Sequence, residues 1–192
     1  MKPVLDSKGF QLSNTVEVSK YIKSGGVGVM ATDTLYGIVG SAYDTEVVER
    51  IYRIKVRQPD KPMIILISDY ADLEQFKIKL DDRLKRSLEN VWPGAVSVIL
   101  PCPSDHFAHL HRGTKTLAFR LPAKQALRQL VLATGPLVAP SANPESLPPA
   151  ATIAQAWSYF GSTVDFYKRG RVSGKSSQLV KFQDNQMVIL RP

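Results

Sequence analysis

The chain has 192 residues, of which 44% are hydrophobic and 22% charged, a composition typical of a folded globular protein. At this length we expect one domain covering residues 1–192. Apolar runs fall short of the roughly 20 residues that cross a bilayer, and the N-terminus lacks the apolar core of a secretion signal. We therefore expect a cytoplasmic protein with no membrane contact. The one cysteine, Cys102, excludes an internal disulfide and a thiolate metal cluster.

The charge balance is basic. Lys and Arg number 25 against 17 Asp and Glu, a formal net charge of +8. Such an excess favours anionic partners such as nucleotides, RNA or DNA. A basic surface that only keeps the protein soluble explains it equally well. Charge alone leaves the partner open.

Apolar periodicity and turn residues divide the chain into alternating helices and strands. In chain order the sequence predicts a helix after Asn14 that stops at Gly25-Gly26, a strand at 26–32, a helix at 44–55, strands at 63–68 and 95–100 separated by a helix at 81–92, a strand at 116–121, a helix at 123–134, a strand at 136–140, a helix at 152–161, and strands at 163–168, 178–182 and 187–192.

Two helix starts carry a capping-box pattern, Asn14 with Glu17 and Thr152 with Gln155. The apolar runs within 63–68 and 95–100 are continuous, as expected for strands covered on both faces. The last two strands, joined through QDNQ, suggest a hairpin. This alternation predicts an α/β domain around a twisted mixed sheet.

Small hydroxyl side chains and cations follow several predicted strands and one helix, where ligands of α/β sheets collect. Cations at a helix C-terminus also complement the macrodipole, and Ser and Asn commonly stabilise turns. Residue types alone therefore leave phosphate binding and a solvated helix end equally open. The candidates are Thr32, Asp33, Thr34, Lys55, Arg57, Lys61, Thr116, Arg120, Ser141 and Asn143.

Two weaker patterns carry no prediction of function. Residues 170–177, GRVSGKSS, nearly spell a P-loop, but the spacing is one residue short, and 178–182 reads as a strand where a P-loop must open a helix. His106, His109 and His111 lack supporting carboxylates or thiolates nearby, so we expect a mobile polar loop and no metal site.

Six segments in order resemble motifs of the YrdC-like family and together span most of residues 15–192. The resemblance implies a YrdC-like α/β fold, with a twisted mixed parallel/antiparallel sheet, flanking helices and a concave basic cleft. The segments are ATDTLYG (31–37), KVRQPDKP (55–62), WPGAVSVIL (92–100), TLAFRLP (116–122), APSANPESLPPA (139–150) and VILRP (188–192).

The resemblance also implies a reaction. Threonine and bicarbonate or CO2 give N-carboxythreonine, whose carbamate oxygen attacks the α-phosphate of ATP and releases pyrophosphate, with Mg²⁺ on the phosphates. The product, threonylcarbamoyl-AMP, passes to a separate transferase complex that modifies a tRNA adenosine. Such chemistry needs positioning and electrostatic stabilisation more than a covalent enzyme intermediate.

The resemblance assigns roles by motif position. Residues that would contact threonine are Thr34, Arg120 and Ser177. Residues that would act on the phosphates are Lys55 and Arg57, as catalytic groups, and Lys61. Residues that would surround the nucleotide are Arg57, Lys61, Thr116, Ser141, Asn143 and Arg191. The prolines around Ser141 and Asn143 would fix a turn that meets ATP already oriented.

The sequence departs from the family pattern in several places. Ala31 replaces a usual proline, Leu66 stands where many longer relatives have a histidine, and Gln178 and Lys181 do not match a usual Ser-Thr-Val-Val-Asp segment. The sequence up to Pro192 also has no counterpart of the extra C-terminal domain of longer synthases, so we expect closure over the nucleotide to come from within this domain or to remain incomplete.

Two other readings stay open. One is an RNA-binding module that uses the same basic concavity without chemistry, although aromatic residues for base stacking are sparse in the motif loops. The other is a YciO-type paralogue with weak or different activity, which the altered segment 176–178 favours.

Overall fold

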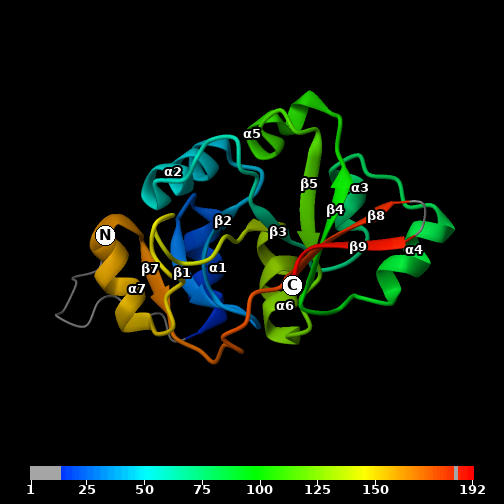
Figure 1. Cartoon of the computed structure of the whole chain (residues 1–192). Coiled ribbons are helices and arrows are strands. Elements are labelled where there is room, and N and C mark those ends of the chain that lie inside the picture. The colour runs from blue at the N-terminus through cyan, green and yellow to red at the C-terminus, as the bar shows by residue number, and fades with distance from the viewer. Residues whose placement is uncertain (1–13, 184–185) are drawn as a thin grey trace.

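The computed structural model describes residues 14–183 and 186–192. Within these residues nine strands form one sheet, in the order β7-β1-β2-β6-β3-β5-β4-β8-β9 (Figure 1). The strands are β1 (Gly28–Ala31), β2 (Tyr36–Ser41), β3 (Ile64–Leu66), β4 (Val96–Pro101), β5 (Thr116–Arg120), β6 (Leu137–Val138), β7 (Phe166–Lys168), β8 (Gln178–Gln183) and β9 (Gln186–Arg191). The helices are α1 (Thr15–Lys23), α2 (Thr45–Lys55), α3 (Asp72–Gln75), α4 (Asp82–Glu89), α5 (Ala108–His111), α6 (Gln125–Thr134) and α7 (Ile153–Phe160), with 3₁₀ turns η1 (Asp105–Phe107) and η2 (Gly161–Thr163).

The sheet is mixed, as the sequence predicts. β1 with β7, β3 with β5, and β4 with β8 are parallel, and the remaining neighbours are antiparallel. β7 lies at one end of the sheet, whereas β8 and β9, next in the chain, lie at the other end beside β4 (Figure 1). The predicted final hairpin is confirmed as the β8–β9 pair, and 184–185 of its connection lie outside the described residues.

The predicted helices are confirmed, with their caps. Asn14 Oδ1 accepts from Glu17 N at 2.8 Å, and Thr152 Oγ1 accepts from Gln155 N at 3.1 Å. Asp44 caps α2 by accepting from two backbone N–H groups. Among the helices of the described ranges, none combines the length and the apolar character needed to cross a membrane.

The sequence pattern predicts no element over residues 36–41, which form the strand β2. This stretch contains two glycines and lacks the alternation that marks a half-buried strand. Gly40 is needed for packing, because a Cβ there would lie 2.4 Å from Cγ1 of Val47 on α2. Gly40 thus allows α2 to pack close to the sheet, and it also interrupts the apolar pattern from which a strand would be predicted.

The histidine segment is also different from the prediction. Residues 105–111 form η1 and α5 rather than a mobile polar loop. His111 is 1% exposed, and its Nδ1 accepts from Gly113 N at 3.1 Å. The His109 ring lies 3.0 Å from the carbonyl of Ala42, through Nε2. These two histidines therefore tie the segment to its neighbours.

Two apolar clusters cover the sheet. On one face, α1 and α6 contribute Val18, Ile22, Leu127 and Leu130, which pack against strand residues such as Met30. On the other face, the larger cluster joins α2 and α7 to the sheet and extends to the C-terminal strands. Helices on both faces of a mixed sheet give the three-layer α/β architecture.

One face of the sheet is partly open across β3, β5, β4 and β8. Register pairs place Ile64, Ala118, Ile99 and Lys181 in one row across these strands, and all four are partly exposed. The expectation that the continuous apolar runs of β3 and β4 are covered on both faces is confirmed at their centres, where the consecutive residues Ile65 and Leu66 are both fully buried, as are Ser97 and Val98. It does not hold for Ile64 and Ile99. These partly exposed residues form the floor of an open surface beside the candidate site.

Helix α2 ends in an uncommon backbone conformation. Its C-cap, Val56, has φ 50° and ψ 39°, the left-handed region, and its side chain is 75% exposed. A β-branched residue is strained there, and glycine is the usual occupant. This turn sends the chain back from buried Lys55 toward Arg57, so the strain lies between two of the predicted site residues.

We expect Val56→Gly to raise the free energy of unfolding by about 1 kcal/mol, because it removes the left-handed strain without removing a buried contact. Urea denaturation would measure the change. The matched control is Val16→Gly on α1, another exposed valine but in helical conformation, which should lower the free energy of unfolding by about 0.5 kcal/mol. A loss of stability in Val56→Gly would contradict the strain.

Candidate active site

A pocket of about 170 Å³ lies where the β1–β2 turn, the end of β5 and the loops after β6 and before β8 meet. Its wall combines hydroxyls, two arginines and a few apolar side chains. The lining residues are Thr32, Thr34, Leu35, Tyr36, Gly37, Ile64, Arg120, Ala139, Ser141, Pro149, Ser176, Ser177 and Arg191.

Five of the residues to which the resemblance assigns a role line this one pocket, although they come from distant parts of the chain. They are Thr34, Arg120, Ser141, Ser177 and Arg191. The remaining predicted residues, Lys55, Arg57, Lys61, Thr116 and Asn143, lie outside its lining and are placed individually below. The pocket thus brings together the predicted threonine group and part of the predicted nucleotide group.

The β1–β2 turn is fixed by its own hydroxyls. Thr32 Oγ1 donates to the carbonyl of Leu35 at 2.7 Å and accepts from Thr34 N at 3.1 Å. The Thr34 hydroxyl lies 3.1 Å from that of Thr32, and both residues are buried. Side chains that bond to nearby backbone in this way stabilise a turn. The Thr34 hydroxyl therefore reaches the pocket in a fixed position.

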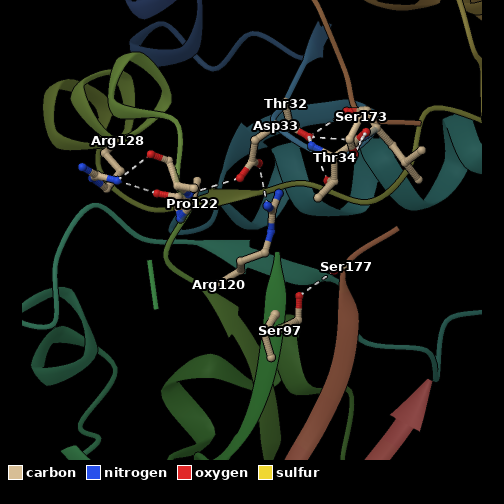
Figure 2. A network of polar contacts seen from close by, with 12 residues as sticks. Thr32, Asp33, Thr34, Ser97, Arg120, Pro122, Arg128, Ser173 and Ser177 are labelled. Carbon is tan, nitrogen blue, oxygen red and sulfur yellow. Dashed lines mark hydrogen bonds and ion pairs between the residues drawn. The ribbon is translucent and has the colours of Figure 1, made fainter. Parts of the chain in front are cut away.

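Arg120 closes the buried end of the pocket. Figure 2 shows it extending from β5 toward Asp33 on the β1–β2 turn, with the Ser97–Ser177 pair on its other side. Arg120 Nη1 lies 2.5 Å from Asp33 Oδ1, and the Ser97 and Ser177 hydroxyls lie 2.9 Å apart. A guanidinium can hold a carboxylate through two parallel N–H groups, and neighbouring hydroxyls can bond to a small polar ligand.

The loop after β6 is held by its own polar groups. Ser141 Oγ donates to Asn143 Oδ1 at 2.7 Å, and Asn143 Nδ2 donates to the carbonyls of Pro144 and Leu147 at 2.9 and 2.6 Å. Asn143 is 8% exposed, so its amide stabilises the loop from inside. Ser141 also forms an isolated bridge with Gly37, which docks the loop on β2.

Lys55 lies beneath this loop. It is 2% exposed, and its Nζ donates to the carbonyls of Ser141 and Asn143, both at 2.5 Å. Burial, and then the positive charge of Arg57, lowers the pKa of Lys55 to about 7, against a smaller opposing effect of Glu145. Lys55 therefore acts on the pocket through the backbone that carries Ser141.

Arg57 and Lys61 bracket a tight loop at the rim. Arg57 Nε and Nη2 donate to the carbonyls of Lys61 and Pro62, each at 3.0 Å. Lys61 Nζ lies 2.5 Å from Glu145 Oε1, while Glu145 Oε2 accepts from Gln58 N at 2.8 Å. The Lys61 bond, then the Gln58 bond, lowers the pKa of Glu145. The carboxylate thus occupies an anion position formed by an ammonium and a backbone N–H.

Arg191 joins this rim to the pocket. Its Nη2 donates to the carbonyl of Ser177 at 2.9 Å. Desolvation lowers the pKa of Arg191, and the positive charge of Arg57 lowers it further. The same charge acts on Lys55. The positive charge of Arg57 thus acts on two neighbouring basic residues, an arrangement that favours an anionic ligand nearby.

Thr116 stands at the opposite end of β5 from Arg120. Four residues along a strand correspond to about 13 Å, but the two side chains point to the same face. The parallel register of Ile64 with Ala118 places Thr116 level with Pro62, directly after Lys61. The open face of the sheet therefore leads from the pocket toward the Lys61 rim.

The two patterns set aside in the sequence have other structural roles. Residues 169–177 lead into the strand β8, not into a helix, and Gly174 N donates to the carbonyl of Thr34 at 3.0 Å. Over residues 14–183 and 186–192, no three His, Cys, Asp or Glu are grouped as a metal would require.

Some contributing residues were not recognised from the sequence. Asp33 was a candidate only by type, and Glu145, Ile64 and Pro149 were not singled out. The Asp33–Arg120 pair joins positions 87 apart, and the Glu145–Lys61 pair joins positions 84 apart. Spacing along the chain gives no signal for such pairs. For the Asp33–Arg120 pair, the position of Asp33 inside the ATDTLYG motif was the one available signal.

Lys55 gives a pH-dependent prediction. Between about pH 7 and its usual pKa of 10.5, the unfolded chain binds more protons at this residue than the folded chain. The quantity to follow is the free energy of unfolding of wild type minus that of Lys55→Met. This difference should rise with pH above about 7, by at most about 1.4 kcal/mol per pH unit, and should be constant below about pH 7. Denaturant titrations of both proteins from about pH 6 to about pH 9 measure this. A difference that is constant with pH would show that the ammonium stays charged.

A model of the Sua5/YciO/YrdC family, described as "Telomere recombination", matches residues 20–192. A threonylcarbamoyl-AMP synthase of Bacillus subtilis (strain 168) is 30% identical over 180 residues, which are 92% of this chain and 52% of the relative. One of Nitrosococcus oceani is 30% identical over 169 residues, 88% of this chain and 91% of the relative.

Solved structures have the same fold. Sua5 of P. abyssi, crystallised with L-threonine, superposes with a TM-score of 0.81 at 25% identity, over 93% of this chain and 53% of that one. E. coli YciO gives 0.80 at 22% identity, over 95% of this chain and 91% of that one, and shows the fold alone. The chain spans about half the length (52%) of the B. subtilis and P. abyssi synthases that it matches.

Proposed function

The chain belongs to the Sua5/YciO/YrdC family, and from this premise we propose that it is an L-threonylcarbamoyladenylate synthase, a nucleotidyltransferase that uses L-threonine, bicarbonate or CO2, and ATP. The observation that carries the proposal is the pocket in which buried Arg120 stands among the hydroxyls of Thr34 and Ser177, with Arg191 at its rim. Two relatives that match about 90% of this chain carry that enzyme's name.

The buried end of the pocket suits the amino acid. The Arg120 guanidinium would bind the α-carboxylate of threonine, and the hydroxyls of Thr34 and Ser177 would bond to its polar groups. The crystal structure of P. abyssi Sua5 in complex with L-threonine supports threonine as the amino acid. Leu66 is fully buried in the cluster under α1 and α6, so it supplies no polar contact here.

The rim suits the triphosphate. Arg57, Lys61 and Arg191 would contact the phosphates, and Ser141 and Thr116 would lie along the nucleotide, with Asn143 supporting the loop. The amine of threonine first forms a carbamate with bicarbonate and releases water. A carbamate oxygen then attacks the α-phosphorus, the bond to the β-phosphate oxygen breaks, and pyrophosphate leaves toward the cations.

Lys55 has a supporting role in this scheme. Because both of its short hydrogen bonds go to the loop of Ser141 and Asn143, it fixes the loop that meets the nucleotide. The expectation of a directly catalytic Lys55 is thus replaced by a positioning role in our proposal, and Arg57 remains the group proposed to stabilise the leaving pyrophosphate.

Magnesium would enter with ATP. The nearest carboxylates of the site, Asp33 and Glu145, are engaged with Arg120 and Lys61, and the described residues lack a group of three metal-binding side chains. Mg²⁺ commonly stays on substrate phosphates and water. Mg²⁺ bound to ATP would neutralise part of the phosphate charge, and the basic side chains of the protein would neutralise the rest.

The proposal places the protein in the cytoplasm, upstream of a transferase complex that moves the threonylcarbamoyl group to a tRNA adenosine. An RNA-binding module is less well supported, because Tyr36, the aromatic residue in the pocket lining, is 4% exposed and bonds through its hydroxyl to Gly170. If the protein does not form the adenylate from ATP, bicarbonate and threonine, the result would favour a YciO-type paralogue with another activity.

The direct test is incubation with ATP, Mg²⁺, bicarbonate and labelled threonine. We expect labelled adenylate and pyrophosphate that both require every substrate. Arg57→Ala should reduce the rate by about 10²-fold, because it removes one electrostatic contact to the leaving group. Arg53→Ala, an exposed arginine one turn earlier on α2, is the matched control and should keep wild-type activity. Tight RNA binding without any adenylate would instead favour the binding module.

Glu145 gives a second prediction. Its carboxylate holds Lys61 and Gln58 N in the position proposed for a phosphate, so ATP must displace it. Glu145→Gln should therefore lower the KM for ATP and strengthen inhibition by pyrophosphate, each roughly threefold to tenfold at low salt. Glu46→Gln on α2 is the control, with no expected effect. Weaker pyrophosphate inhibition in Glu145→Gln would mean that the carboxylate supports the phosphate site rather than competing for it.

A further inference from the structure

Asp33 makes two contacts that join separate parts of the site. Its Oδ1 lies 2.5 Å from Arg120 Nη1, and its Oδ2 accepts from Ala123 N at 3.2 Å (Figure 2). The carboxylate thus links the β1–β2 turn to the end of β5 and to the segment that leads into α6. Both oxygens are engaged at the point where Arg120 enters the pocket.

The Asp33–Arg120 pair is the most enclosed ion pair described. The Arg120 side chain is 4% exposed and that of Asp33 13%, whereas the other pairs of the described ranges have at least one partner above 25%. A buried guanidinium without a counter-charge is strongly unfavourable. Asp33 therefore stabilises Arg120 in its buried position before any substrate arrives.

Asp33 is itself held in place. Thr32 and Thr34 on either side form the hydroxyl-stabilised turn. On the outer side, the loop before β8 bonds to the same turn, with Ser173 N donating to the Asp33 carbonyl at 3.4 Å and Ser173 Oγ donating to the Thr34 carbonyl at 3.2 Å. A carboxylate on such a turn can orient its partner with little freedom of its own.

We propose that Asp33 is a positioning residue that orients Arg120 and thereby sets the preference of the pocket for a ligand with an α-carboxylate. This inference rests on the proposed function, in which Arg120 binds threonine. Asp33 engages Arg120 at Nη1, so the Nε–Nη2 edge can present two parallel N–H groups to a second carboxylate. Fixing one corner of the guanidinium fixes the direction of that edge.

The test compares two ligands that differ only at the group Arg120 would bind, L-threonine and L-threoninamide, by calorimetric titration of wild type and Asp33→Ala. Wild type should prefer threonine, and the preference should fall by about 10- to 100-fold in Asp33→Ala, because a misoriented guanidinium no longer matches the carboxylate. A merely structural loss would weaken both ligands by the same factor and leave their ratio unchanged.

Two further variants sharpen the result. Asp33→Glu keeps the charge and should restore most of the preference. Asp165→Ala is the matched control, because Asp165 also binds an arginine, Arg50, and a backbone N–H, that of Val27. It should lower the melting temperature without changing the ratio of the two affinities.

An unchanged or increased preference for threonine in Asp33→Ala would overturn the proposal, since an increase would mean that Asp33 mainly weakens the charge of Arg120. If wild type binds neither ligand, the proposed function and this inference fall together. If wild type prefers threonine but forms no adenylate, the proposed activity fails, and the ratio in Asp33→Ala still decides the role of Asp33.

Discussion

The site depends on keeping the charge of Arg120 buried at the end of β5. A guanidinium that is 4% exposed requires a counter-charge, and the chain supplies it from the turn between β1 and β2, 87 positions earlier. This requirement fixes where the β1–β2 hairpin ends relative to β5. It also explains why the turn has so many internal bonds, since a loosely held Asp33 would leave the cation unpaired for part of the time.

The open face of the sheet provides the second constraint. Helices α1 and α6 cover this side over β1, β2 and β6, but the row from Ile64 to Lys181 remains partly exposed. Small and apolar side chains such as Ala118 give a floor on which an extended ligand can lie. The pocket at the Arg120 end and the cations at the Lys61 end are thus parts of one surface, joined by the alternation of side chains on β5.

Local features of the fold could be predicted from the sequence, and contacts across the chain could not. Capping residues such as Asn14 and Thr152 marked helix starts because capping is a short-range interaction. Strand β2 was missed because Gly40, which α2 requires at close approach, breaks the apolar pattern. Of the five predicted residues that line the pocket, Thr34, Arg120 and Ser141 follow predicted strands and are candidates by type, and the motif resemblance adds Ser177 and Arg191. The partners of Arg120, Lys61 and Lys55 required coordinates, since hydrogen bonds between distant loops leave no periodic signal.

The basic side chains of the site differ in burial and in the strength of their pairing, and this difference suits them to different roles. Lys55 and Arg120 are buried and paired with fixed groups. Lys55 therefore holds the loop of Ser141 in place, and Arg120 stands in the pocket already oriented. The Lys61–Glu145 pair is partly exposed, with side chains 46% and 27% accessible, and solvent competes for both partners. Under the proposed function, a triphosphate would therefore exchange with Glu145 more readily than with Asp33. The end proposed for the amino acid is accordingly rigid, and the end proposed for the phosphates is adjustable.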